Sequence, residues 1–177
     1  MLTGYGHWLP NDIRGSTHLK RDKLGEFGPI HSGRKRIQPS EQELRDFYRR
    51  AERLLQFQPI WFDHAKRQAL GEAFSQLIDG RYTVWACAIC RNHVHFCIRA
   101  HRERAETMWK RLIDAGRNAI RAFPDVEPGH EVWTRVPYIV FLSTLDEVRD
   151  RIEYINRNPV KEGLPIQRWS FVQPYTA

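Results

Sequence analysis

The chain has 177 residues, of which 41% are hydrophobic and 28% are charged, and these proportions exclude an intrinsically disordered or a fibrous protein. The formal net charge of +7 favours a polyanionic partner such as nucleic acid, although charge alone leaves a basic protein without such a partner equally open. No apolar run approaches the roughly 18 residues of a membrane span, and three cysteines fit a reducing compartment, so we expect one soluble cytoplasmic domain over residues 1–177.

The N-terminal part combines a turn-rich loop, a basic segment and a helix. Residues 4–15 are dense in Gly, Pro, Asn and Asp, which indicates a loop. Residues 18–39 place Lys and Arg among glycines, and we interpret them as a mobile basic loop that either contacts phosphates or is merely solvated. Ser40 followed by Glu43 is the pattern of a capping box, which predicts a helix from there to about Gln56.

The middle of the chain predicts two helices around a β-hairpin. Apolar residues at helical spacing indicate a helix over 63–78. Two strand-like runs follow at 81–90 and 93–99, and the two residues between them suit a tight turn. An apolar stripe recurring every three or four residues then predicts a helix over 103–123.

The C-terminal part predicts a strand and a last helix. Residues 131–142 are strand-like despite Pro137, which suggests an edge strand or a bend. Thr144 and Glu147 form a second capping box, opening a helix that ends near 158–159. This order of elements predicts an α+β fold in which helices pack on an antiparallel sheet.

The predicted strand 93–99 carries two histidines on one face. Strand alternation places Val94, Phe96 and Ile98 on the apolar face, and it places His93, His95 and Cys97 on the other. Alternate residues of a strand lie about 7 Å apart, so both imidazoles could reach one metal ion. The pattern His-x-His by itself leaves two readings open, a metal site or two polar residues on a solvated face.

A zinc site is a competing interpretation of the same segment. Cys87, Cys90, His93 and His95 follow the spacing Cys-x-x-Cys-x-x-His-x-His, which resembles a zinc ligand set. In a regular strand, however, residues three apart face opposite sides, so only a bulge would bring Cys87 and Cys90 together. A zinc-dependent phosphoesterase that uses these residues therefore remains an alternative.

The last predicted helix has a tyrosine away from its apolar stripe. Leu145, Val148, Ile152 and Ile155 fall within an arc about 80° wide. Tyr154 lies about 140° from the centre of that arc, and the side chain four residues later, Asn158, lies about 40° from Tyr154. A tyrosine in this position is either a surface aromatic or a hydroxyl with a polar function.

Taken together, four segments in order resemble the single-tyrosine transposases of the HUH nuclease superfamily, and among them the REP-associated tyrosine transposases. The segments are TGYGHWLPNDIRGS, NHVHF, IEYINRNPVKEGL and QRWSFVQPY. The resemblance spans most of the chain, although residues 18–80 match only in general helical character.

The resemblance implies a fold, a reaction and a set of site residues. The implied fold is a ferredoxin-like antiparallel sheet, with His93 and His95 as metal ligands and Asn158 as a third, amide-type ligand. Tyr154 corresponds to the nucleophile that forms a 5′-phosphotyrosine with single-stranded DNA near a hairpin. The implied cofactor is Mg²⁺ or Mn²⁺, and the implied protein is a nucleoid-associated transposase that acts as a monomer or a homodimer.

DNA binding would fall to basic residues of the predicted helices and to aromatic residues of the opening loop. Single-stranded DNA requires positive charge and exposed aromatic rings, and Tyr5 and Trp8 could supply the rings or simply pack under the loop. A catalytically inactive descendant that only binds nucleic acid is the main alternative. The predicted basic DNA-binding residues are Arg104, Lys110, Arg111, Arg117, Arg151 and Arg157.

Overall fold

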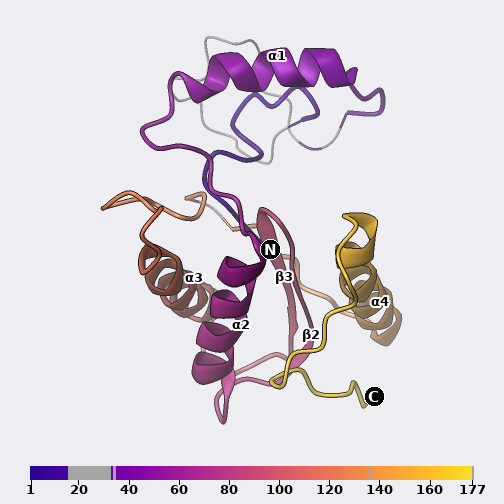
Figure 1. The fold of residues 1–177 in the computed structure, drawn as a ribbon. Coiled ribbons are helices and arrows are strands. Elements are labelled where there is room, and N and C mark those ends of the chain that lie inside the picture. The colour runs from indigo at the N-terminus through magenta and orange to yellow at the C-terminus, as the bar shows by residue number, and fades with distance from the viewer. Residues whose placement is uncertain (16–32, 34, 136, 177) are drawn as a thin grey trace.

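The computed structural model of the chain describes residues 1–15, 33, 35–135 and 137–176 (Figure 1). Over these residues the fold is α+β, as predicted, with four helices and an antiparallel sheet of three strands in the order β1-β3-β2. In this part of the chain, no helix is long and apolar enough to cross a membrane. The elements are β1 (Leu2–Thr3), α1 (Glu41–Glu52), α2 (His64–Ile78), β2 (Val84–Ile89), β3 (His93–Ile98), α3 (Ala105–Arg121) and α4 (Leu145–Lys161).

The predicted β-hairpin is confirmed, and its register sets the two faces of the sheet. Cys90 N–H donates to the His93 carbonyl at 2.8 Å, which closes the turn at 91–92. Ala88 pairs with His95, so these two residues share a face. β1 adds its two residues to the other edge of β3, where Thr3 pairs with His93.

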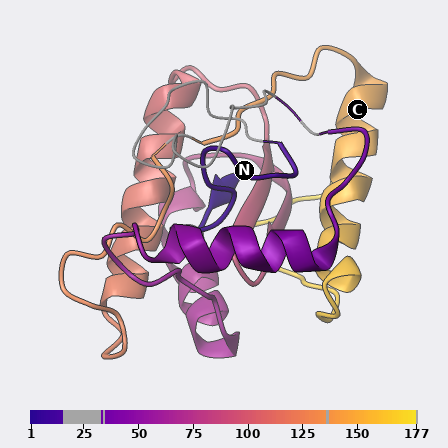
Figure 2. The same ribbon diagram turned by 90° about the horizontal axis from the view of Figure 1, so that it is seen from above.

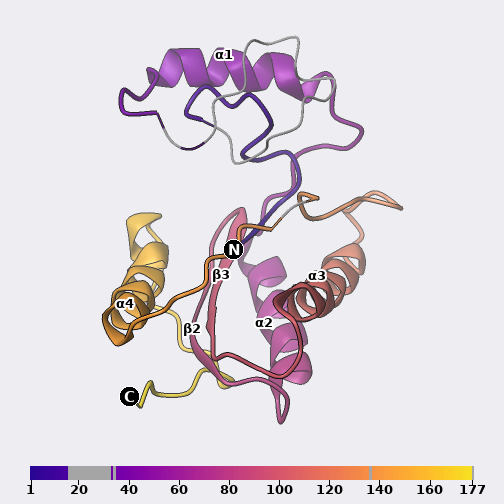
Figure 3. The same cartoon turned by 180° about the vertical axis from the view of Figure 1, so that it is seen from behind.

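The main core lies on the face of the sheet that carries Val94, where α2 and α3 pack side by side (Figures 1 and 3). The apolar residues predicted for this face, Phe96 and Ile98, pack against the core from β3. The apolar stripe of α3 is also confirmed by the buried residues Leu112 and Ile120. Alternation along β3 therefore places the histidines on the opposite face.

That opposite face is covered by α4 (Figure 1). β2 presents the small side chains Ala86 and Ala88 there, which allows the helix to lie close to the sheet. Ile155 of α4 is 1% exposed against them. Leu145 falls in the same apolar arc, but as the first residue of the helix it is 56% exposed.

Both predicted capping boxes are present, but two helix ends differ from the prediction. α1 ends at Glu52 rather than Gln56, because the next residues form tighter turns in which Leu54 N–H donates to the Ala51 carbonyl. α4 continues through Pro159 to Lys161, although this proline has no N–H to donate to the carbonyl of Ile155. Gly163, with φ +69°, then ends it.

The predicted strand over 131–142 is wrong for its described residues. The segment pairs with the N-terminal residues through an isolated bridge between Gly4 and Trp133, and Tyr5 N–H donates to the Val132 carbonyl and Thr134 N–H to the Thr3 carbonyl, both at 2.8 Å. Farther along, Tyr138 N–H donates to the Met1 carbonyl at 3.1 Å. The N–H groups that face the N-terminal residues belong to Thr134 and Tyr138, so the position of Pro137 faces away from this pairing, and the segment runs beside β1 as an edge without becoming a regular strand.

Helix α1 and the opening loop lie together at the turn end of the hairpin, and Figure 2 shows α1 across this end between α3 and α4. Residues 4–15 form the predicted turn-rich loop, which has a small core of its own around Leu9 and Phe47. Asp12 and Arg14 pair there at 2.6 Å. The predicted basic loop 18–39 falls mostly outside the described residues.

Candidate active site

Tyr154 and the two histidines lie next to one another in the same chain. The Tyr154 and His95 ring centroids are 5.6 Å apart with their planes at 88°, and the His93 and His95 centroids are 4.9 Å apart at 89°. Tyr154 is 42% exposed, whereas His95 is 8% exposed. The fold thus brings a solvent-accessible phenol against a buried imidazole pair.

Asn158 joins this group from the next turn of α4. It is buried, and its Oδ1 accepts a weak hydrogen bond from Cys90 Sγ at 3.9 Å. Its side chain also interacts with His93 and raises the pKa of that imidazole, against the larger effect of burial. The helical projection correctly placed Tyr154 and Asn158 away from the main stripe, but their exposures differ because Asn158 lies under the hairpin turn.

Burial keeps both imidazoles neutral. Burial, with a smaller contribution from the neighbouring His93, lowers the pKa of His95 to about 3. Burial also lowers the pKa of His93, against an opposing effect of Glu162. Neutral imidazoles keep a free lone pair, which is the form that binds metal ions.

The buried donor atoms fit a divalent metal ion. His93, His95 and Asn158 offer two imidazole nitrogens and an amide oxygen on one side of the sheet. Imidazole suits transition ions, while amide oxygens suit harder ions such as Mn²⁺ and Mg²⁺. The arrangement is therefore compatible with the ligand set expected from the sequence.

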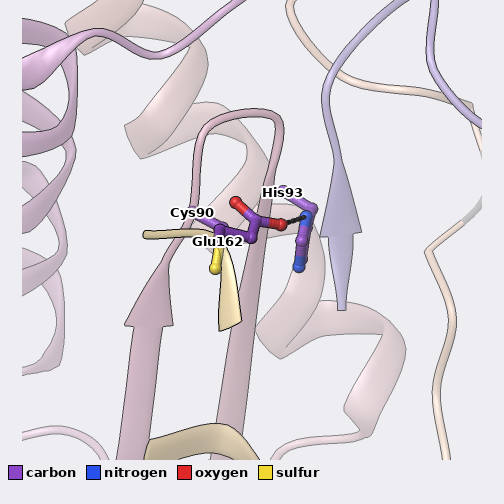
Figure 4. A group of neighbouring side chains, drawn as sticks. All are labelled: Cys90, His93 and Glu162. Atoms are coloured by element: carbon purple, nitrogen blue, oxygen red, sulfur yellow. Dashed lines mark ion pairs between the residues drawn. The ribbon is translucent and has the colours of Figure 1, made fainter. Parts of the chain in front are cut away.

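Cys90 and Glu162 lie beside His93 and could also bind a metal (Figure 4). Neither was predicted as a ligand of the metal ion next to Tyr154. Cys90, His93 and Glu162 offer ligand atoms that all lie within 4.8 Å of one another. Glu162 Oε1 is 3.7 Å from His93 Nδ1, and Glu162 Oε2 accepts from Arg91 N–H at 3.2 Å. Nothing in the sequence spacing pairs Glu162 with the hairpin, since their proximity depends on how α4 docks.

Two cations flank the Tyr154 ring. The Arg151 guanidinium carbon is 5.6 Å from the ring centroid, and Lys161 Nζ is 4.9 Å from it. Lys161 was not predicted as a site residue. A signal for it does exist, because Arg151, Tyr154, Asn158 and Lys161 follow one another at intervals of three, four and three, which is one helical face.

A cavity of about 600 Å³ opens beside the tyrosine, and two of the predicted DNA-binding residues line it. Arg104 and Arg151 lie on its wall together with His95 and Tyr154. The other four predicted cations do not line it, and three of them have acidic partners. These are Arg111 with Glu103 at 3.4 Å, Arg117 with Asp114 at 2.6 Å and Arg157 with Glu153 at 3.1 Å, while Lys110 is exposed on α3.

The aromatic residues of the opening loop have packing roles. Tyr5 contacts the rings of Phe57 and His130, and its hydroxyl accepts from Gln56 N–H at 3.0 Å. The Arg14 guanidinium lies 3.9 Å from the centroid of the half-buried Trp8 ring, so one face of this ring packs within the loop. The packing interpretation is therefore the better one for both residues.

The four-residue zinc set is not assembled. Cys87 packs in the main core, whereas Cys90 packs on the opposite face with Cys97 and Ile155. Strand alternation therefore separates the two cysteines, as the sequence argument anticipated.

Comparison with known proteins adds no further constraint. No family model, no curated protein and no solved structure matches the chain. The assignment of a function depends on the motifs in the sequence and on the geometry around Tyr154.

Proposed function

We propose that this protein is a metal-dependent single-stranded DNA endonuclease and strand transferase, with the ferredoxin-like HUH fold, in which Tyr154 is the nucleophile. The observation that carries the proposal is the position of the Tyr154 ring against His95 within one chain. A phenol beside a buried imidazole pair, with cations on both sides, suits attack on a phosphodiester.

His93, His95 and Asn158 would hold the ion, Mg²⁺ or Mn²⁺. Such an ion supplies Lewis-acid stabilisation of charge at the scissile phosphate. The three side chains keep a fixed position because two lie on a paired strand and the third is held under the hairpin turn. Burial also excludes water from the imidazoles, which strengthens their electrostatic interactions.

Tyr154 is positioned to react from the solvent side. Its phenolic oxygen attacks phosphorus and loses its proton to solvent, and the bond from phosphorus to the 3′ oxygen breaks. The leaving oxygen takes up a proton and becomes a free 3′-OH, while the 5′ phosphate stays on the tyrosine. The phosphodiester energy is retained in this intermediate, so attack by another 3′-OH rejoins DNA.

Arg151 and Lys161 would bind the phosphates on either side of the scissile bond. Both lie over the ring of the nucleophile, where their charge offsets the charge of the phosphate oxygens. Arg104 extends this positive surface along the cavity wall. Unpaired nucleotides of a hairpin-flanking strand would enter that cavity, which also carries the exposed aromatic rings of Tyr138 and Phe141.

The test is a dual-label cleavage assay with hairpin-containing single-stranded DNA and Mn²⁺. A label at the 3′ end should become attached to the protein, and a label at the 5′ end should appear on a shorter, free fragment with a 3′-OH. Tyr154→Phe should abolish both products. Tyr138→Phe is the matched control, because Tyr138 is also exposed in the same cavity, and it should retain both products.

Two other outcomes would contradict the proposal. Cleavage without an adduct that survives Tyr154→Phe would indicate a hydrolase, such as the zinc-dependent phosphoesterase. Binding of the DNA with no cleavage by the wild-type protein would indicate a non-catalytic nucleic-acid-binding descendant.

A further inference from the structure

We propose that Cys90, His93 and Glu162 form an alternative metal-binding set that takes Zn²⁺. This set is distinct from the ligands proposed for DNA cleavage, with which it shares His93 alone. The inference goes beyond the proposed function, and its test requires neither DNA nor Tyr154.

The three ligand atoms are already close enough for one ion. They come from three places, the end of β2, the start of β3 and the C-terminal cap of α4, and they lie within 4.8 Å of one another (Figure 4). Ligands on one tetrahedral zinc ion are separated by roughly 3.3–3.8 Å, given bonds of about 2.0–2.3 Å. Glu162 Oε1 and His93 Nδ1 are at 3.7 Å, so small side-chain rotations would complete the site.

Neighbouring backbone and side-chain groups hold these ligands in place. The Cys90 N–H bond to the His93 carbonyl fixes the two hairpin residues relative to each other. Arg91 N–H binds the second carboxylate oxygen of Glu162, which leaves Oε1 facing His93. His93 Nδ1 is the ring nitrogen on the Glu162 side, so it would be the zinc ligand, with the ring proton on Nε2; its 2.8 Å hydrogen bond with Asn92 Oδ1 would be exchanged for the bond to the metal.

The ligand types favour zinc over the ions proposed for DNA cleavage. Zn²⁺ accepts thiolate sulfur, imidazole nitrogen and carboxylate oxygen as ligands, whereas Mg²⁺ and Mn²⁺ prefer oxygen ligands. On binding, the Cys90 S–H bond breaks, its proton passes to the buffer and a sulfur–zinc bond forms. A water molecule would complete the fourth position.

The surroundings of the set also suit a metal site. Cys90 is fully buried, the His93 side chain is 12% exposed and the Glu162 side chain is 27% exposed. An ion can therefore enter from the carboxylate side while the thiol stays away from solvent. A buried thiolate next to a carboxylate is unfavourable without a cation, and a divalent ion compensates both charges.

Cobalt absorption spectroscopy on the metal-free, full-length protein provides the first test. Titration with Co²⁺ should produce a thiolate-to-cobalt charge-transfer band in the near ultraviolet. Cys90→Ala and the nearly isosteric Cys90→Ser should both lose this band. Cys87→Ala should keep it, because Cys87 is a buried cysteine of the same strand that faces the opposite side of the sheet.

Zinc competition against a chromophoric chelator provides the second test. Glu162→Gln, which keeps the shape of the side chain, should weaken Zn²⁺ binding by at least about tenfold. Glu153→Gln, on the exposed side of α4, should leave Zn²⁺ binding unchanged. Far-ultraviolet circular dichroism of each variant shows that the fold is retained.

Three results would overturn the inference. The first is a wild-type protein that binds Co²⁺ without the thiolate band. The second is a band that persists in both Cys90 variants, and the third is Zn²⁺ affinity that does not change in Glu162→Gln. Because DNA cleavage takes no part in these measurements, their failure would leave the proposed role of Tyr154 intact.

Discussion

The ring of Tyr154 in α4 lies edge-on to the imidazole of His95 in β3 of the same chain, with the two centroids 5.6 Å apart. The adjacent residue of the helix, Ile155, is buried against the small residues Ala86 and Ala88 of β2. That contact holds the helix on its own sheet, so one copy of the chain supplies the phenol and both imidazoles.

This arrangement predicts catalysis within one chain. Tyr154→Phe and His95→Gln should each abolish the covalent DNA adduct, and a mixture of the two variants should remain inactive, because neither chain then contains both groups. The check is the 3′-label adduct assay on the mixture after prolonged incubation. Appearance of an adduct would instead show that two copies exchange their α4 helices.

Arg151 should contribute a phosphate contact that is visible in the salt dependence of DNA binding. Its guanidinium lies over the Tyr154 ring on the cavity wall. Arg151→Ala should weaken binding of single-stranded DNA and reduce the slope of log affinity against log salt by about 0.7. Fluorescence anisotropy at several salt concentrations measures the slope. Arg149→Ala removes an exposed residue paired with Asp146, and it should leave the slope nearly unchanged. Equal slopes for the two variants would contradict a phosphate contact of Arg151.

The free energy of unfolding of the metal-free protein should fall as the pH falls below neutrality. Burial holds the pKa of His95 at about 3, whereas a histidine of the unfolded chain titrates near 6.5. Between these values the unfolded state binds a proton that the folded state does not, which costs up to about 1.4 kcal/mol of stability per pH unit. The stability that the lowered pKa of His95 contributes is fully present above the pKa of histidine in the unfolded chain, and it is lost as the pH falls. The lowered pKa of His93 acts in the same direction.

Urea unfolding with a chelator present, at several pH values between 7.5 and 5, measures this dependence. His95→Gln removes the titrating group, so its stability should change less with pH than that of the wild type. Parallel curves for the two proteins would show that His95 is not the group responsible.

Gly71 should be required by the packing of the C-terminal segment on α2. A Cβ atom at this position would clash with the six-membered ring of Trp169. Alanine is the better helix former, yet Gly71→Ala should lower the free energy of unfolding by about 1–3 kcal/mol because the ring must move. In urea unfolding, Gly71→Ala should cost less stability in a Trp169→Leu background than in the wild type. An equal cost in both backgrounds would rule out the clash as the cause.

Zinc should inhibit Mn²⁺-dependent cleavage if both proposals hold, because His93 belongs to both ligand sets. Zn²⁺ bound with Cys90 and Glu162 would draw the His93 imidazole away from His95 and Asn158. Inhibition by low Zn²⁺ should therefore be strong in the wild type and in Cys87→Ala and weaker in Cys90→Ala. Equal inhibition of all three proteins would place the inhibitory zinc elsewhere.

Local sequence patterns were sufficient for most of the secondary structure. The capping boxes at Ser40 and Thr144 predicted two helix starts, and both are present because capping depends on side chains within three residues of the cap. Alternation along 93–99 likewise predicted which face carries the histidines, since the side-chain period of a strand is a local property. The errors concern features with distant partners, such as 131–142, where ladder formation depends on a neighbouring strand.

The composition of the site depended on the tertiary structure to a greater extent than the secondary structure did. The sequence by itself determined that His93 and His95 share a face and that Tyr154 and Asn158 lie off the main stripe of their helix. Their proximity arises because α4 docks on the alanines of β2, a contact between segments far apart in the chain.

The docking of α4 on β2 also decided which site residues could not be predicted from the sequence. It brings Glu162 to within 3.7 Å of His93, whereas strand alternation by itself places Cys90, rather than Cys87, on the side of the imidazole. Sequence spacing reports the face of one element but not the distance between two elements. That distance is determined by how closely side chains allow the elements to pack, and here the tertiary structure alone decided it.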